Sequence, residues 1–249
     1  MLLEGREPLP LVVRADRQTA GRGQGARVWW SDAGSLLFTI GIDPVVYGLR
    51  TEQIPRVALV TALAVIAAIE SVSPRVRPGI RWPNDIEVED RKLGGILPEC
   101  VTTPQGRRLA IGIGLNVNNR FDSAPAEIRA LATSLSVLTH HETAIEPLFQ
   151  AILERIEPEL RALSRDDPGQ VARFVARDQL RDRPIRLEVG SELSSGIGRG
   201  IEARGALLFE DREGVTRPVF SGRVLRDPPP TGLIPAVLDR PDSESGRSR

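Results

Sequence analysis

Lysine is almost absent from this sequence of 249 residues, although positive charge is not. Of the 33 basic residues, 32 are arginine, and the only lysine is Lys92 in the glycine-containing stretch EDRKLGGIL, residues 89–97. Lysine differs from arginine in carrying a compact, strongly hydrated charge that reaches a single oxygen. We therefore interpret Lys92 as a candidate functional residue, against the alternative of a surface lysine in a hairpin.

Cysteine and histidine are also scarce. The single cysteine, Cys100, excludes an intramolecular disulfide, favours a reducing compartment, and is interpreted as a small buried apolar residue. His140 and His141 are the only histidines. Because neighbours in sequence point in different directions, and no cysteine or carboxylate cluster has metal-ligand spacing, we expect neither a Ser-His-Asp triad nor a protein metal site.

Net charge is absent as well, with 33 acidic residues against 33 basic ones. This balance gives no support to a general attraction to nucleic acid or to an anionic membrane, although a local basic loop could bind phosphate. The longest apolar run, residues 57–69, is shorter than the roughly 20 residues that span a bilayer. The first residues lack the pattern of a signal peptide, so we expect a cytoplasmic protein.

Short strands and amphipathic segments fill the first 180 residues. Apolar patterning predicts strands at 9–15, 35–42, 79–82, 86–89, 93–99 and 107–117, with a hairpin turn at Asp90. It predicts helices at 51–72, 125–131, 146–163 and 168–177, and a polar, glycine-rich loop at 16–34. The fold class is α/β (α+β).

The composition changes near residue 183, where short alternating segments separated by Gly and Asp begin. We expect residues 1–180 to form the larger domain and residues 181–227 a small all-β domain. A unit of roughly 45 residues has a marginal core of its own, so it should pack on the first domain. Residues 228–249 contain PPP and RPDSESGRSR and are expected to be disordered.

Three stretches have the composition of ligand-binding segments. In QTAGRGQGAR, residues 18–27, the small residues allow close approach of a ligand, and Arg22 and Arg27 suit contact with phosphate. A mobile surface loop with two solvated arginines is the alternative. The loop fits neither a Walker motif nor a dinucleotide fingerprint.

The second stretch, RWPNDIEVEDRKLGGIL, places Asp85 seven residues before Lys92 across the expected hairpin, so the two side chains could converge. Gly94 and Gly95 would let a substrate lie against the backbone. In the third stretch, GIGLNVNN, Gly112 and Gly114 indicate that something packs closely on that face, and Asn116 is an inward polar group that needs partners. The alternative is a β-bulge with an Asn satisfied by backbone.

In this order the three stretches resemble the biotin protein ligase family. The family's Gln-x-x-Gly-Arg-Gly loop ending in Arg-x-Trp matches residues 18–29, and its basic-Trp-Pro-Asn-Asp segment matches 81–85. Its Arg-Lys-Leu-x-Gly-Ile-Leu segment matches 91–97, and its Gly-x-Gly-hydrophobic-Asn-hydrophobic-x segment matches 112–118. The resemblance implies a mixed-sheet biotin/lipoate-ligase-like catalytic domain followed by a small SH3-like β-barrel. It also implies an ATP-dependent enzyme that activates biotin as biotinyl-5'-AMP, with Mg²⁺, and transfers it to a lysine of a biotin carboxyl carrier protein.

The resemblance also suggests a role for each matching residue. Lys92, Arg22 and Asp85 would be catalytic: Lys92 would hold the biotin carboxylate and then the acyl phosphate, Arg22 would neutralise phosphate charge, and Asp85 would orient the acceptor lysine or take its proton. The full set that would bind biotin or ATP is Gln18, Gly21, Arg22, Gly23, Arg27, Trp29, Trp82, Asn84, Lys92, Gly94, Gly95, Ile96, Gly114 and Asn116. Homodimerisation is possible, and neither nucleic acid nor membrane is an expected partner.

The sequence departs from the family pattern at three places. Only 17 residues precede Gln18, and they contain no Ser-Thr-Asn segment of the kind that commonly helps bind the ureido ring. Gln24 stands where the family usually has a second arginine, which predicts weaker retention of the adenylate. The closing segment, residues 222–226, lacks the usual Glu, so no contact to ATP is assigned there, and a DNA-binding helix-turn-helix is not expected.

Two other functions remain open from the sequence. A lipoate–protein ligase shares the fold and the acyl-adenylate chemistry, although the Arg-Gly loop with Trp29 and the appended β segment favour biotin. A non-catalytic module that binds biotin or the carrier is the alternative from a different class.

Overall fold

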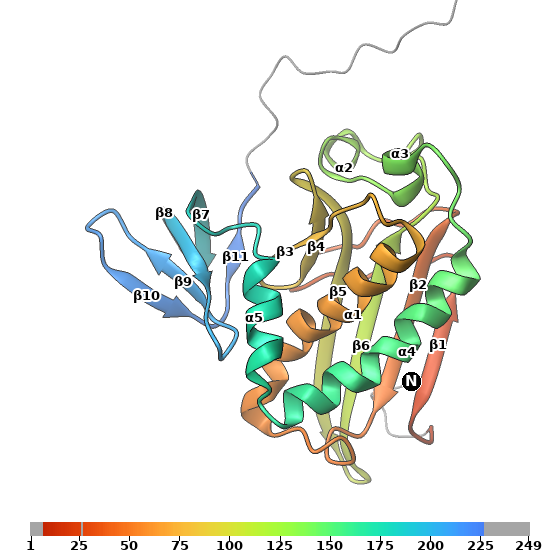
Figure 1. Cartoon of the computed structure of the whole chain (residues 1–249), viewed down its shortest axis with the longest axis horizontal. Helices are drawn as coiled ribbons and strands as arrows, with labels where there is room; N and C mark the ends of the chain where they lie inside the picture. The colour runs from red at the N-terminus through yellow and green to blue at the C-terminus, as the bar shows by residue number, and fades with distance from the viewer. Residues whose placement is uncertain (1–6, 26, 227–249) are drawn as a thin grey trace, which may run out of the picture.

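The computed structural model describes residues 7–25 and 27–226, and the expected disordered tail at 228–249 lies outside them. A six-stranded sheet in the order β1-β2-β6-β5-β4-β3 forms the centre of the larger part of the molecule (Figure 1). Its strands are β1 (Leu11–Ala15), β2 (Ser35–Ile42), β3 (Gly79–Arg81), β4 (Asp85–Val88), β5 (Arg91–Thr103) and β6 (Gly106–Asn116).

Helices cover one face of this sheet (Figure 1). They are α1 (Val57–Val72), preceded by the 3-10 turn η2 (Thr51–Arg56), α4 (Ile145–Ser164) and α5 (Pro168–Ala176), while the short α2 (Ala126–Leu131) and α3 (Leu135–Thr139) lie at one end. On the helix-covered face, Phe38 of β2 packs edge-on against Phe149 of α4, with ring centroids 5.0 Å apart. Because successive side chains of a strand alternate between faces, Gly95 of β5 and Gly112 and Gly114 of β6 lie on the other face.

The predicted α/β class is confirmed, but the expectation of a mixed sheet is wrong. Every ladder between the named strands of this sheet is antiparallel. The direction of a strand depends on its connections, which alternation along one strand does not reveal. The helix α3 was not predicted, because five residues give too short a periodic pattern, and β5 continues past Pro98 to Thr103, four residues beyond its predicted end.

The helical segment Thr51–Val72 is long and apolar enough to cross a membrane by length and composition, contrary to the expectation from residues 57–69 alone. However, 72% of its most apolar window is buried inside the molecule. Alanine, valine, leucine and isoleucine occupy most of the helix surface, so α1 can be enclosed by the sheet and α4 on different sides. We therefore interpret it as a core helix.

The segment from residue 183 onward forms a second, five-stranded antiparallel sheet in the order β10-β9-β8-β7-β11 (Figure 1). Its strands are β7 (Arg183–Val189), β8 (Glu192–Ile201), β9 (Leu207–Glu210), β10 (Thr216–Val219) and β11 (Arg223–Val224). The expected packing on the first domain is observed, because Trp82 Nε1 donates to Gly205 O at 3.0 Å and Arg56 donates to Ala203 O at 3.2 Å. The SH3-like barrel and the exact domain limits remain predictions.

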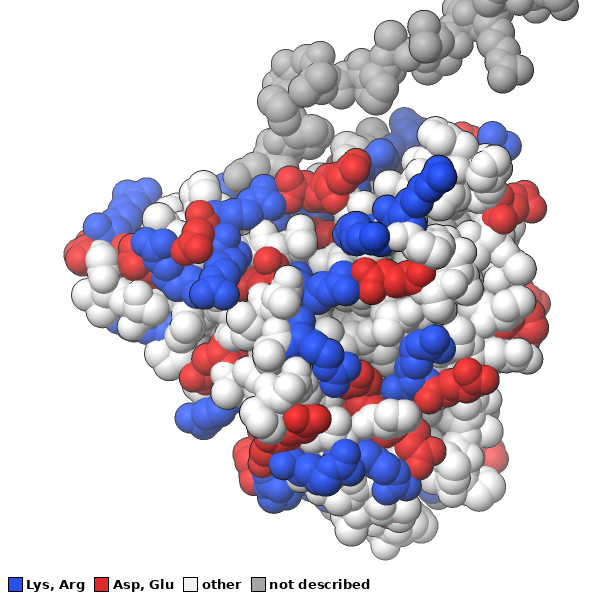
Figure 2. Space-filling model, viewed as in Figure 1, with Lys and Arg blue, Asp and Glu red and all other residues white. Residues whose placement is uncertain are grey.

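Basic and acidic side chains are interspersed over the face seen in Figure 2. Many charged side chains of the described residues form ion pairs, such as Arg183 with Asp90 and Arg177 with Glu70. This distribution agrees with the zero net charge of the chain.

Candidate active site

The loop between β1 and β2 folds back on itself as a short hairpin over the glycine-bearing face of the sheet. Gly23 N donates to Arg27 O at 2.8 Å, and Trp29 N donates to Gly21 O at 2.9 Å. A Cβ atom on Gly21 would lie 2.4 Å from Trp29 O, so the two arms of the loop can only approach this closely with glycine at that position. Gly21 therefore shapes the loop and does not line the cavity beneath it.

Trp29 lies flat on two glycines that face each other across β5 and β6. A Cβ atom on Gly114 would be 2.6 Å from the indole Cε2, and one on Gly95 would be 3.2 Å from Cζ3. The prediction that something packs closely on the glycine face is confirmed, and the packed group is this indole. The Trp29 Nε1 atom is buried and has no hydrogen-bond partner within the described residues.

Lys92 and Asp85 meet across the β4–β5 hairpin, as the spacing predicts. Lys92 Nζ lies 2.6 Å from Asp85 Oδ1 and 5.2 Å from the centre of the Trp29 ring. The Cβ position of Gly95 is 3.4 Å from Nζ, so glycine leaves the space that the lysine head group occupies. The ammonium group thus lies beside the glycine floor with two further N–H donors available to a ligand.

Asp85 is held by a second cation that comes from the end of the C-terminal sheet. Arg226 Nη2 lies 3.0 Å from Asp85 Oδ2. Burial opposes ionisation of this carboxyl, but the charges and hydrogen bonds of Lys92 and Arg226 outweigh burial and hold the pKa of Asp85 below its usual value. Asp85 is therefore better suited to orient a cationic group than to accept a proton from it.

Arg226 also contacts a second carboxylate, Glu87, whose side chain is fully buried. Arg81 Nε lies 3.8 Å from Glu87 Oε1. Burial raises the pKa of Glu87, although the two arginines counteract it. The cluster joins β3 and β4 to the end of the second sheet.

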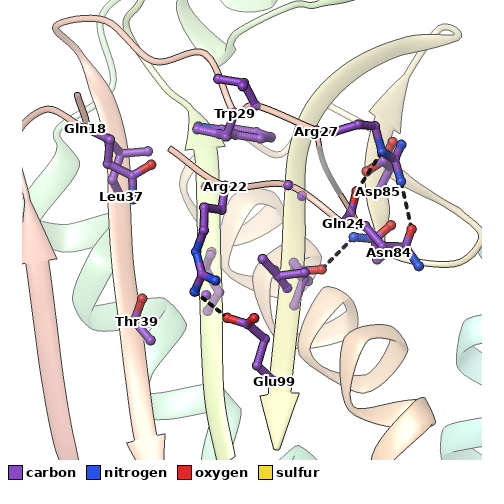
Figure 3. Close-up of a pocket in the computed structure, with 18 of the residues that line it drawn as sticks. Gln18, Arg22, Gln24, Arg27, Trp29, Leu37, Thr39, Asn84, Asp85 and Glu99 are labelled. Carbon is purple, nitrogen blue, oxygen red and sulfur yellow. Dashed lines mark hydrogen bonds and ion pairs between the residues drawn. The ribbon is translucent and has the colours of Figure 1, made fainter. Parts of the chain in front are cut away.

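The two arginines of the loop point in different directions (Figure 3). Arg27 extends toward Asn84 and Asp85. Its Nε donates to the backbone O of Gln24 at 3.0 Å, and its Nη2 donates to Gln24 Oε1 at 2.9 Å. Arg22 extends along the strands in the other direction, and its Nη2 lies 2.7 Å from Oε2 of Glu99 on β5.

These groups surround a cavity of about 350 Å³. The sequence-predicted residues that line it are Gln18, Arg22, Gly23, Arg27, Trp29, Asn84, Asp85, Lys92, Gly95, Ile96 and Gly114. Asn84 is fixed at the wall because its Nδ2 donates to Ile96 O at 2.8 Å. The structure thus brings residues from four separate segments of the sequence to one cavity.

Apart from Gly21, three predicted site residues do not line this cavity. Trp82 is only 2% exposed and faces the core and Gly205, so it does not supply an apolar wall. Gly94 faces Leu115 on the helix-covered side of the sheet. Asn116 is buried below the site, where its Nδ2 donates to Lys92 O at 3.3 Å and thereby supports the lysine backbone.

Several residues of the cavity were not predicted, namely Leu37, Thr39, Leu97, Glu99 and Ala110. They lie on the same face as the glycines, at every second position of β2, β5 and β6. Alternation from Gly95 would have selected Leu97 and Glu99. Arg226 had no comparable signal, because its position depends on how the second sheet packs.

The remaining polar candidates lie outside this cavity. His140 caps the C-terminal end of α3 with φ 61°, and His141 follows it on the surface. Within the described residues, no group of three or more His, Cys, Asp or Glu side chains could hold a metal ion. Cys100 is only partly buried, and its sulfur lies 3.6 Å from an Arg107 nitrogen, which is a more polar setting than expected.

The fold and the cavity define an α/β ligand-binding domain with an appended antiparallel β sheet, and known structures share this arrangement. Biotin protein ligase from Aquifex aeolicus in complex with biotin and ATP superposes with a TM-score of 0.74 at 27% identity, covering 86% of this chain and 87% of that one. The biotin/lipoate A/B protein ligase family model matches residues 5–118.

Curated sequences agree. The biotin–[acetyl-CoA-carboxylase] ligase of Mycobacterium tuberculosis is 30% identical, covering 86% of this chain and 78% of the relative, and that of Paracoccus denitrificans is 31% identical, covering 81% and 85%. The bifunctional ligase/repressor BirA of Bacillus spizizenii is 30% identical, and the match spans 66% of its length. This chain belongs to the biotin/lipoate A/B protein ligase family, and the relatives named above are biotin ligases of that family.

Proposed function

We propose that this protein is an ATP-dependent biotin–[biotin carboxyl carrier protein] ligase. It joins biotin to ATP as biotinyl-5'-AMP, releasing pyrophosphate, and then transfers the biotinyl group to a lysine of a biotin-dependent carboxylase, releasing AMP. One observation carries most of the proposal: the only lysine of the chain lies in a glycine-floored cavity, with its ammonium group 2.6 Å from a partly buried aspartate.

Lys92 binds the carboxylate of biotin through the N–H donors that Asp85 leaves available, and it stabilises the negative charge of the acyl phosphate in both steps. Arg27, at the same end of the cavity, lies where it can contact the α-phosphate. Closure of the loop and Trp29 over the site would exclude water that hydrolyses the adenylate.

The acceptor lysine loses a proton to water before its neutral amine attacks the acyl carbon, and AMP leaves as the bond between that carbon and the phosphate oxygen breaks. Asp85, which stays ionised, accepts a hydrogen bond from this amine and so orients it. Mg²⁺ would arrive with the phosphates of ATP, because this cation is usually held by one or two carboxylates together with substrate phosphates. Asp85 is the carboxylate at the end of the cavity where Lys92 and Arg27 lie, and it is already ion-paired to Lys92 and Arg226, which fits a metal held chiefly by the nucleotide. The ion supplies neutralisation of phosphate charge when bound.

The proposed protein acts in the cytoplasm, with the carrier domain as its macromolecular partner. We propose neither nucleic acid nor membrane as a partner, and a homodimer is possible.

The test is biotin- and ATP-dependent labelling of a purified carboxyl carrier domain. We expect labelling by the unmodified chain, and we expect Lys92→Ala and Lys92→Arg to lower its rate by at least 100-fold. Arg91→Ala is the matched control, because it removes a neighbouring positive charge that faces Arg129 O instead of the cavity. Equal labelling by the Lys92 and Arg91 variants, or no labelling by the unmodified chain, would contradict the proposal. Replacing biotin with lipoate distinguishes the lipoate-ligase alternative.

A further inference from the structure

A second cavity lies between the C-terminal end of α1, the strand β4 and the connection from α3 to α4. Its volume is about 800 Å³, against about 350 Å³ for the cavity at Lys92, and among the described residues the two cavities share no lining residue. Val76 and Val88 are buried in its lining, Leu138 is half-buried, and Val72 remains 38% exposed. A concave apolar surface of this size has room for several side chains of another segment.

The charged side chains that line this second cavity balance each other. Arg75 and Arg77 carry positive charge, Glu89 and Glu142 carry negative charge, and all four are exposed. The two adjacent histidines of the lining add no charge when they are neutral. A strongly charged ligand, such as a nucleic acid, therefore meets no net attraction here. The apolar lining must select the occupant.

The described part of the chain ends beside this cavity. Arg226 Nη1 donates to Asp90 O at 3.3 Å. Glu89, the neighbour of Asp90 in the β4–β5 turn, lines the cavity together with Val88 of β4. In Figure 1 the chain leaves β11 toward the end of the molecule at which this turn and α3 lie. The residues that follow Arg226 therefore start next to the cavity.

The sequence after Arg226 contains one apolar segment. Within residues 227–249, every alanine, valine, leucine and isoleucine lies in LIPAVL, residues 233–238. Pro235 disfavours a helix within this segment, so an extended conformation is expected if the segment binds. The preceding DPPPT, residues 227–231, favours a polyproline conformation, which covers about 16 Å in five residues at about 3.1 Å per residue.

We propose that residues 233–238 bind in the second cavity of the same chain. The segment supplies the apolar side chains that the lining selects, and the proline-rich connection begins beside the β4–β5 turn. Because the segment is tethered to the domain, its effective concentration is on the order of millimolar, so weak contacts are enough to hold it. For these six residues the proposal replaces the disorder expected from the composition of residues 228–249. It does not depend on the proposed function.

The first test forms a disulfide between the segment and the cavity in a Cys100→Ser background. Val237→Cys is combined with Val72→Cys at the cavity, or with Val189→Cys as the matched control. Val189 is a valine of similar exposure, 42% against 38%, outside the cavity, and it follows Glu188, which pairs with Arg223 of β11, so the same tether can reach it.

We expect the disulfide to Val72→Cys to form at least about tenfold faster than the disulfide to Val189→Cys, as a monomer on a denaturing gel. Equal rates, or a faster reaction with Val189→Cys, would overturn the inference. A disulfide-linked dimer as the main product would also overturn it, because the occupant would then be the segment of a second copy.

The second test measures hydrogen exchange of the full chain by mass spectrometry. Leu233→Asp with Leu238→Asp places two charges in the apolar segment, and Ser243→Asp with Ser245→Asp is the matched control outside it. We expect residues 233–238 of the unmodified chain to exchange at least about tenfold more slowly than a free peptide of the same sequence. The first variant should lose this protection and the control should keep it. Exchange as fast as that of the free peptide in the unmodified chain would refute the docking.

Discussion

The contact between Trp29 and the glycine floor predicts a specific effect of adding one methyl group. In Gly114→Ala the new Cβ atom would lie 2.6 Å from Cε2, 2.7 Å from Cζ2 and 3.1 Å from Nε1 of the indole. These distances are well below van der Waals contact, so the ring must lift from the sheet or the strand must shift. Forcing a methyl group into a packed site costs about 1–3 kcal/mol.

Gly112→Ala is the matched control on the same strand. Its nearest neighbour would be Leu97 O at 3.4 Å, so the methyl group fits. Alanine also limits the unfolded chain more than glycine does, so we expect Gly112→Ala to be neutral or to stabilise by up to about 1 kcal/mol.

Urea unfolding of the two variants, with and without Trp29→Ala, measures the effect. We expect Gly114→Ala to lower the free energy of unfolding by about 1–3 kcal/mol when Trp29 is present and to cost much less when it is absent, because the two residues are in contact. Indole fluorescence should shift to the red as the ring becomes more exposed. An equal cost of Gly114→Ala in both backgrounds would refute the argument that this indole requires glycine.

Three further effects follow from the charged groups. Arg226→Gln should lower the free energy of unfolding at pH 7 by about 3 kcal/mol, because it leaves Glu87 buried with a weaker charge partner. Since burial already raises the pKa of Glu87, the loss should shrink as the pH falls and the carboxyl becomes protonated, as urea unfolding from pH 4 to 8 would show. Asp166 is paired with Arg50 and Arg56, and the hydrogen bond from Arg56 is the largest of the causes that hold its pKa well below the usual value. Its contribution is therefore present above the unfolded pKa of about 3.9 and lost in stronger acid, so Asp166→Asn should destabilise at pH 7 and much less at pH 2. Gln24→Arg should reduce release of activated biotin, because it adds a positive charge at the phosphate end of the cavity. The readout is nonspecific biotinylation of a bystander protein, and no difference from the unmodified chain would contradict it.

Short-range features of the fold were predictable from the sequence. The turn at Glu89 and Asp90, both with positive φ, lies between the strands β4 and β5. This hairpin brings Asp85 and Lys92 together. The glycines of β6 indicated a close neighbour, because glycine weakens a strand unless something must approach its backbone.

Features that depend on long-range packing were not predictable. Register determines which side of the sheet a residue at the end of a strand faces. The sequence Trp82-Pro83-Asn84 therefore did not indicate that Trp82 points away from the cavity while Asn84 lines it. The antiparallel order of the sheet likewise depends on the connection through α1, which carries the chain from β2 to β3 at the opposite edge.

The end of the second sheet contributes Arg226 to the site. The division of the sequence into a larger domain and a separate β domain gave no indication of this contact. Asp85 is separated from Arg226 by 141 positions, yet the guanidinium of Arg226 holds one carboxylate oxygen while Lys92 holds the other. Arg81 also donates to Leu225 O at 2.9 Å, so the end of β11 is tied to β3 next to the cavity. A carboxylate held from both sides keeps its orientation and its charge, whereas one held by Lys92 alone could rotate with the lysine. Docking of the C-terminal sheet is therefore coupled to the geometry of Asp85, and a change that loosens the sheet should disturb the site without touching any residue that lines it.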